Sequence, residues 1–139
     1  MTNFHIDILT LDREIFSGEV TSVTLPGVEG VFTALAKHMA FVTPLTFGEV
    51  VYRDANNKQT NLSIARGVFS TDGKSATLLI EDASFASEIS EEKALAARQR
   101  AEELIKKGVS KEDKAAAIYQ YRKSLVDIRV VRKLRNVAR

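Results

Sequence analysis

Two histidines, His5 and His38, are the side chains in this 139-residue sequence best suited to acid–base chemistry or metal binding. Neither belongs to a zinc-binding pattern such as His-Glu-x-x-His, which places two imidazoles on one helix face. We expect His5 on a strand surface, and His38 in an irregular segment with a structural or contact role. No serine stands in Gly-x-Ser-x-Gly, the turn that exposes a nucleophilic hydroxyl. Hydrolytic and metal-dependent chemistry therefore lack support.

Paired glycines and paired acids are weaker candidates for chemistry. The glycines of Gly27-Val-Glu-Gly30 are spaced as in a phosphate loop, but the Gly-Lys-Ser/Thr ending and a following helix are missing, so a turn is predicted. Adjacent acids such as Glu81-Asp82 diverge on a strand, and Glu91-Glu92 lie ~100° apart on a helix. The sequence predicts no catalytic residues, although a small enzyme with an unrecognised carboxylate site stays open.

Positive charge near the C-terminus is the strongest chemical signal. Asp127 is the only acid between positions 122 and 135, where six basic residues form what we call the basic cluster: Arg122, Lys123, Arg129, Arg132, Lys133 and Arg135. Such a cluster suits nucleic acid or an acidic protein surface, and the simpler interpretation is a solvated helix face. Because only two aromatic residues accompany it, Tyr119 and Tyr121, we favour an acidic protein partner.

The charge is divided between two parts of the chain. Residues 1–89 hold 6 Lys and Arg against 11 Asp and Glu, a net charge of −5, whereas residues 90–139 hold 14 against 7, a net charge of +7. With 45% hydrophobic residues the chain has the composition of a soluble globular protein. It has no cysteine, which excludes disulfides and thiolate ligands. No apolar run approaches the ~18–20 residues of a transmembrane helix, and the N-terminus does not resemble a secretory signal.

Hydrophobic residues alternate with a period of two over the first 86 residues, as in half-buried strands. Phe4, Ile6 and Ile8 form one such face. Segments rich in β-branched residues predict further strands at 20–25, 49–52, 59–65, 67–70 and 76–80. Turn-forming residues separate these segments, which indicates a sandwich or barrel.

Strong helix formers dominate after residue 86. Ser90 is placed to cap a first helix over about 90–107, and Gly108 to close it. Ser110, followed at the third position by Asp113, opens a second helix that continues past residue 130. The sequence therefore predicts two domains, a β-sandwich over 1–86 and a C-terminal antiparallel two-helix hairpin over 87–139.

Each predicted helix has a seam of apolar residues on which the other can pack. The seams consist of Ala97, Ala101 and Leu104 on the first helix and of Ile118, Tyr121, Leu125 and Ile128 on the second. Because the first seam is mostly alanine, little apolar area is available to hold the helices together. We expect a hairpin that is unstable alone and that docks, swings or extends according to the surface that offers more burial.

Taken together, these segments resemble the epsilon subunit family of the F-type ATP synthase over the whole chain. The most specific resemblance lies in Ile15-Phe-Ser-Gly18, in Val20-Thr-Ser-Val-Thr-Leu-Pro-Gly27 and in Glu29-Gly30. The stretch from His38 to Leu45, followed by Gly48, is similar to the family's histidine-containing loop. Segments 67–69 and 79–83 resemble its last sandwich strands, and the hairpin completes the pattern. In place of the usual Pro-Gly before the histidine, the chain has Ala36-Lys37.

The resemblance implies a ten-stranded β-sandwich and a non-catalytic rotor subunit that couples proton or sodium flow to ATP synthesis. It implies a peripheral place on the cytoplasmic face of a bacterial membrane, where the sandwich packs on the gamma subunit and on the c-ring. The interface candidates are Glu29, Val31, Phe32, His38 and Met39. In the family, the extended hairpin reaches the alpha–beta ring, where basic residues meet an acidic segment on beta and suppress ATP hydrolysis. The basic cluster supplies the candidate contacts, and the rival hypothesis is a basic-helix nucleic-acid-binding module.

Some bacterial members of the family bind ATP at Ile/Leu-Asp-x-x-Arg-Ala, where the first helix begins. The corresponding residues here are Ile89, Ser90, Lys93 and Ala94. Ser90 lacks the carboxylate acceptor, and Lys93 replaces a forked guanidinium by a point charge. We therefore expect weak or absent ATP binding and no other cofactor.

Overall fold

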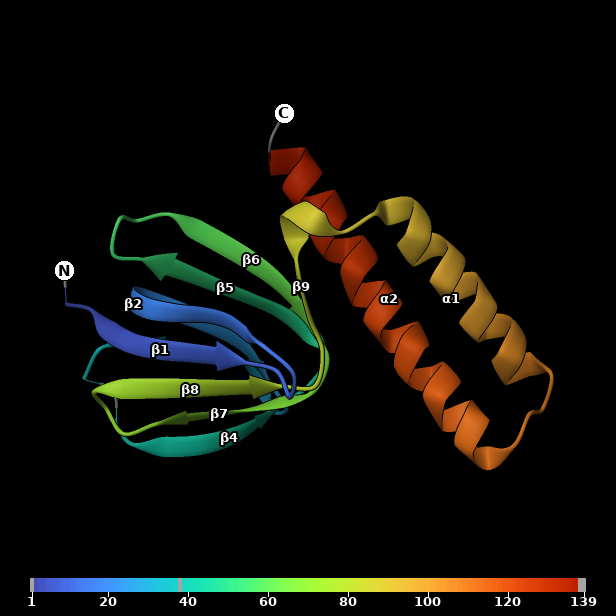
Figure 1. Ribbon diagram of the computed structural model, residues 1–139, viewed down its shortest axis with the longest axis horizontal. Coiled ribbons are helices and arrows are strands. Elements are labelled where there is room, and N and C mark those ends of the chain that lie inside the picture. Colours follow the sequence, from blue (N-terminus) through green and yellow to red (C-terminus); the bar gives the residue numbers. More distant parts are fainter. Residues whose placement is uncertain (1, 38, 138–139) are drawn as a thin grey trace.

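The computed structural model describes residues 2–37 and 39–137, and it places a β-sandwich before a helical hairpin (Figure 1). The strands of the described residues are β1 (Phe4–Leu9), β2 (Glu14–Gly27), β3 (Gly30–Leu35), β4 (Phe41–Leu45), β5 (Gly48–Asp54), β6 (Gln59–Ile64), β7 (Gly67–Thr71), β8 (Ser75–Ile80) and β9 (Ala83–Phe85). A 3₁₀ turn, η1 (Ala86–Glu88), leads to α1 (Glu91–Lys106) and α2 (Lys111–Val137). The predicted fold class, a sandwich followed by a two-helix hairpin, is confirmed.

The long strand β2 joins the two layers of the sandwich. Its first half pairs with β1, and its second half pairs with β3 along one edge and with β5 along the other. From β1 the sheet continues through β8 and β7 to β4, and from β5 it continues through β6 to β9. A single bridge between Gly27 and Leu45 joins β4 to β2. The resemblance implied ten strands, and the described residues contain nine because β2 runs unbroken through both layers.

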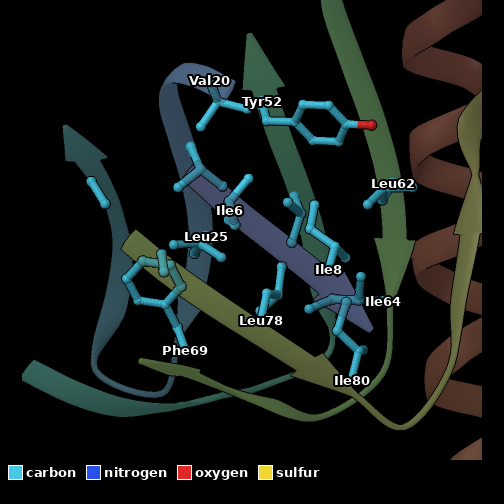
Figure 2. Close-up of a cluster of buried hydrophobic side chains, with 14 of the residues drawn as sticks. Ile6, Ile8, Val20, Leu25, Tyr52, Leu62, Ile64, Phe69, Leu78 and Ile80 are labelled. Carbon is cyan, nitrogen blue, oxygen red and sulfur yellow. The ribbon is translucent and has the colours of Figure 1, made fainter. Parts of the chain in front are cut away.

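Alternating apolar side chains fill the space between the layers. The outward and inward positions of β1 alternate as predicted, so that Phe4, Ile6 and Ile8 are buried. Figure 2 shows Ile6, Leu25 and Phe69 among the side chains that point into this core from different strands. Full burial of one such side chain contributes about 1.5–3 kcal/mol. No residue of α1 or α2 belongs to this main core, so the core of the sandwich is complete without the hairpin.

The predicted strands at 20–25, 49–52, 67–70 and 76–80 fall within strands of the structure, and the one predicted at 59–65 is β6, which ends one residue earlier, at Ile64. The sequence predicts no strand at Gly30–Leu35 or Phe41–Leu45, which form β3 and β4. The described residues between these strands lie in no strand, in agreement with the irregular segment expected around His38. In β3 the apolar residues Val31 and Leu35 are 74% and 55% exposed. Apolar residues on the solvent side hide the alternation that identifies a strand. His38 itself lies outside the described residues.

Both helices begin at the predicted caps, and α1 also ends at its predicted signal. Ser90 Oγ accepts a hydrogen bond from the Lys93 backbone N–H at 3.2 Å, and Ser110 Oγ accepts one from Asp113 N–H at 3.2 Å. Gly108 follows α1 with a φ of +69°, a conformation that glycine adopts without steric cost. The short link turns the chain back, so α2 lies between the sandwich and α1 (Figure 1).

The predicted seams of the hairpin were only partly right. Ala101 and Ile128 are buried, as expected, whereas Leu104, Ile118 and Leu125 are 43%, 41% and 39% exposed. The reason is that α2 packs against two neighbours, α1 and the sandwich, so its buried stripe is displaced and wider than one seam.

Candidate protein interface

A small apolar cluster holds α2 against the sandwich. Ala86 of η1 is buried with Val126 and Val130 of α2, and the partly buried side chains of Phe47 and Ile89 pack around them. This cluster is separate from the main core and contains only three buried residues. The hairpin therefore docks through much less apolar area than the area that holds the sandwich layers together.

A buried ion pair lies beside this apolar cluster. Lys123 Nζ lies 2.7 Å from Asp127 Oδ1, one turn further along α2, and the two side chains are 5% and 20% exposed. The sandwich completes the site, because Ser63 Oγ donates to Asp127 Oδ1 at 2.5 Å and Lys123 Nζ donates to Ser84 Oγ at 3.3 Å. Among the described residues, no buried side-chain nitrogen or oxygen lacks a hydrogen-bond partner. The docked position of α2 therefore satisfies this pair.

Aromatic rings and an arginine form a second contact near the start of α2. The rings of Phe47 and Tyr119 meet edge to face with centroids 5.2 Å apart. The Arg122 guanidinium lies 4.3 Å from the centroid of the Phe47 ring and donates to Thr46 Oγ1 at 3.2 Å. Each such cation–π contact contributes about 0.5–1 kcal/mol when exposed.

Two glutamates pair with three further basic residues of α2. Glu49 of β5 pairs with Lys133 at 2.8 Å. Glu91, in the first turn of α1, accepts from Arg132 at 2.9 Å and from Arg135 at 2.8 Å. The hydrogen bond from Arg132 lowers the pKa of Glu91, and the charge of Arg135 adds to this effect. Glu91 therefore remains ionised and joins the two ends of the hairpin.

Five of the six residues in the basic cluster thus have partners within the chain. Within residues 2–37 and 39–137, Arg129 makes no hydrogen bond or ion pair, and its side chain is exposed. Lys123 is buried in this docked form, so any contact between Lys123 and another protein requires the hairpin to move. The sequence carried a signal for this burial, since Lys123 and Asp127 stand at i and i+4 beside Val126 and Val130.

Of the residues that the resemblance assigned to the c-ring and gamma, Glu29 and Val31 lie at the β2–β3 turn, whereas Met39 follows the opposite end of β3. Glu29 lies in the turn and is exposed, and Val31 and Met39 are 74% and 80% exposed. The ring of Phe32 instead faces inward, where it meets Phe69 with a centroid distance of 6.0 Å. Of these candidates, Glu29, Val31 and Met39 are accessible to a partner.

The four residues at the degenerate ATP motif lie at the entry to α1. Ile89 packs on the small apolar cluster of Ala86, Val126 and Val130, which we call the docking cluster. Ala94 is buried, and Ser90 Oγ accepts the capping hydrogen bond at the start of α1. Together with Lys93, these residues line a shallow hollow that also includes Arg13 and Asp127. Weak or absent ATP binding stays a prediction.

The structure brings together a serine, a histidine and an aspartate that sequence reasoning did not connect. His5 Nε2 lies 3.0 Å from Asp7 Oδ1 and 3.3 Å from Ser17 Oγ, and Ser17 donates to Asp7 at 2.6 Å. The bond from Ser17, followed by that from His5, lowers the pKa of Asp7. In a catalytic triad the serine and the aspartate bind opposite ring nitrogens. Here both bind Nε2, so the arrangement is a hydrogen-bonded surface group on a strand, as expected for His5.

Nowhere in residues 2–37 and 39–137 do three or more His, Asp or Glu side chains gather as a metal ion would require. Neither described helix is long and apolar enough to span a membrane.

Comparisons with known proteins agree on one family. The model of the family described as "ATP synthase, Delta/Epsilon chain, beta-sandwich domain" matches residues 3–86. The ATP synthase epsilon chain of Geotalea uraniireducens is 37% identical over 115 residues, which are 83% of this chain and 82% of that protein. The epsilon chain of Nitrosococcus oceani is 30% identical over 131 residues, 94% of each chain.

Solved structures support the fold. A chain in the Euglena gracilis mitochondrial ATP synthase, in a structure of OSCP, F1 and c-ring, superposes with a TM-score of 0.74 at 18% identity, over 88% of this chain and 77% of that one. A chain in the central stalk and c-ring of the Tetrahymena thermophila mitochondrial ATP synthase gives a TM-score of 0.61 at 15% identity, over 94% and 97%.

Proposed function

The chain belongs to the delta/epsilon family of ATP synthase chains, and we propose that it serves as the non-catalytic rotor subunit of the central stalk in an F-type enzyme. In that role it couples ion flow through the c-ring to ATP synthesis, and the chemistry stays on its partner subunits. The observation that carries this proposal is the match to epsilon chains over the hairpin as well as the sandwich, up to 94% of the chain.

The proposed partners are the gamma subunit and the c-ring for the sandwich, and the alpha and beta subunits for the hairpin. This places the chain at the cytoplasmic face of a bacterial membrane, held there through the complex. Exposed Val31, next to the turn at Glu29, offers the sandwich an apolar contact with an acidic residue beside it, and exposed Met39 offers a second one beyond the far end of β3.

We propose that the hairpin restrains ATP hydrolysis when it leaves the sandwich. The docking cluster buries only three residues, so release exposes little apolar surface and is inexpensive compared with unfolding. Release also frees Lys133 from Glu49 of the sandwich and exposes Lys123, which lets both residues pair with an acidic segment of beta.

The rival hypotheses find no support in the comparisons. A nucleic-acid-binding module needs its cations free for phosphates, whereas most of the basic cluster is paired within the chain. An enzyme with a carboxylate site would need acids whose environments push their pKa values apart, and the lowered pKa values of Asp7 and Glu91 belong to surface hydrogen bonds.

Purification of the tagged chain from its own cells tests the proposal. We expect alpha, beta and gamma subunits to co-purify, and a Val31→Asp variant to lose them while Asn56→Asp, on the exposed β5–β6 turn, keeps them. A preparation that retains nucleic acid through moderate salt and contains no ATP synthase subunits would reject the proposal.

Truncation tests the regulatory part. A chain that ends at residue 89 keeps every residue of the main core and should still assemble. We expect the complex that contains it to hydrolyse ATP faster than the complex with the full chain. Equal rates in fully assembled complexes would reject inhibition by the hairpin and leave the rotor role standing.

A further inference from the structure

The apolar contacts of α2 with the sandwich do not define a unique position along the helix. Val126 and Val130 are one helical turn apart, and Leu134 follows after another turn. A slide of α2 by four residues, ~6 Å along its axis, would place Val130 where Val126 lies and Leu134 where Val130 lies. Apolar residues of similar volume substitute for one another at small cost. The apolar cluster alone therefore accepts two positions of the helix.

The buried polar contacts, in contrast, distinguish these positions. The same slide would bring Asp127 to the place of Lys123, beside Ser84, and Val131 to the place of Asp127, beside Ser63. The Ser63 hydroxyl, which is fully buried, would then lose its acceptor, and Lys123 would no longer meet Ser84. An unpaired buried charge or hydroxyl is costly, because water no longer solvates it.

We propose that the Lys123–Asp127 pair, completed by Ser63 and Ser84, is a register lock that selects one docked position of the hairpin. The pair adds little net attraction, because removing two charges from water offsets their Coulomb energy. Its effect is to make every other docked position of α2 less stable. The hairpin therefore has one defined docked form and one released form, with no shifted intermediates between them.

Distance measurements between spin labels on the full chain test the lock, and the protein is well suited to them because it has no cysteine. The nitroxides are attached to Lys58→Cys in the β5–β6 turn and to Lys114→Cys in α2. Both positions are exposed. For the otherwise unchanged chain we expect one narrow distance. The lock concerns the isolated chain, so its failure would leave the proposed function untouched.

Three variants separate selection of a position from simple attraction. Lys123→Met or Asp127→Asn leaves the other charge buried and should raise the released fraction at least about tenfold. A triple variant, Ser63→Ala with Lys123→Met and Asp127→Leu, removes both charges and the buried Ser63 hydroxyl, and its docked fraction should equal that of the unchanged chain. Its distance distribution should be broader or should show a second maximum, because the position is no longer selected.

The control is Arg98→Met, which breaks the exposed pair between Arg98 and Glu102, at the same i, i+4 spacing and 3.9 Å apart. It should leave the distance unchanged. Three results would overturn the lock: single variants that dock like the unchanged chain, a triple variant with the same narrow distance, or a triple variant released as often as the single ones. In the last case the pair would hold α2 by attraction.

Amine acylation of the unchanged chain, read by mass spectrometry, gives an independent measurement. Lys123 should react at least about tenfold more slowly than the exposed amines of Lys106 and Lys114, and Asp127→Asn should remove most of this protection. Equal reactivity of all three lysines in the unchanged chain would contradict a buried pair in solution.

Discussion

The sandwich and the hairpin interface are built by different physical rules. The main core holds 17 buried residues, all of them apolar or aromatic. The interface between α2 and the sandwich combines three buried apolar residues with a buried ion pair, an aromatic contact and charged residues at its edge. Area removed from water is the main source of stability, so the first region is firm and the second is only just stable. The difference shows that one chain can combine a stable domain with an element that detaches from it, if most of the buried apolar residues lie in the domain and few lie at the interface.

The largest effect should come from a change in the sandwich core. Phe69 is fully buried, and Phe69→Ala should lower the free energy of unfolding by about 3–5 kcal/mol because it leaves a cavity between the layers. Denaturant titration followed by circular dichroism measures this. A loss confined to the helices, with the strands unchanged, would contradict the separation of the two regions.

A change in the docking cluster should have a smaller and more local effect. Val130→Ala removes two buried carbons and should weaken docking by roughly 1.6 kcal/mol, with little effect on the strands. Nuclear magnetic resonance of the full chain should show shifts in α2 and η1 only. Leu134→Ala is a matched control at a position that is 37% exposed, and it should shift the resonances of α2 and η1 far less.

A still smaller effect is expected at the charged link between the helices. The ionised form of Glu91 is favoured by the hydrogen bond from Arg132, which lowers the pKa of Glu91 below its ordinary value of 4.5. The stability that ionised Glu91 adds to the hairpin is therefore fully present above pH 4.5, and it is lost as the pH falls through the lowered pKa. Helicity of residues 91–137 should therefore decrease as the pH falls below about 4.5. In Glu91→Gln this decrease should be shallower, and an identical titration would show that the link contributes nothing.

The smallest effect on docking is predicted for Arg129. Because its side chain is exposed and pairs with no described residue, Arg129→Ala should change docking by less than about 0.5 kcal/mol. In the assembled complex the same variant should weaken the inhibition of ATP hydrolysis, because Arg129 is the member of the basic cluster already available to beta. Unchanged inhibition would exclude Arg129 from the contact.

The sequence predicted the fold class, the strands with alternating hydrophobicity and the caps at Ser90 and Ser110, because each depends on local patterns. It did not predict β3, where Val31 and Leu35 are apolar on the solvent side. The helix seams were displaced for a related reason, since a 27-residue helix with two neighbours has no single buried face. The sandwich partners of the Lys123–Asp127 pair are distant in sequence: Ser84 lies 39 positions before Lys123, and Ser63 lies 64 positions before Asp127. No local pattern contains such a relation.

The central claim is that the hairpin opens from a sandwich that remains folded, and hydrogen exchange of the full chain tests it most directly. We predict that the amides of α2 exchange through a local opening whose free energy is several kcal/mol below that of global unfolding. The amides of β1, β2 and β8 should exchange only when the whole chain unfolds. If α2 and these strands exchanged with the same free energy, the chain would be one cooperative unit and the claim would be wrong.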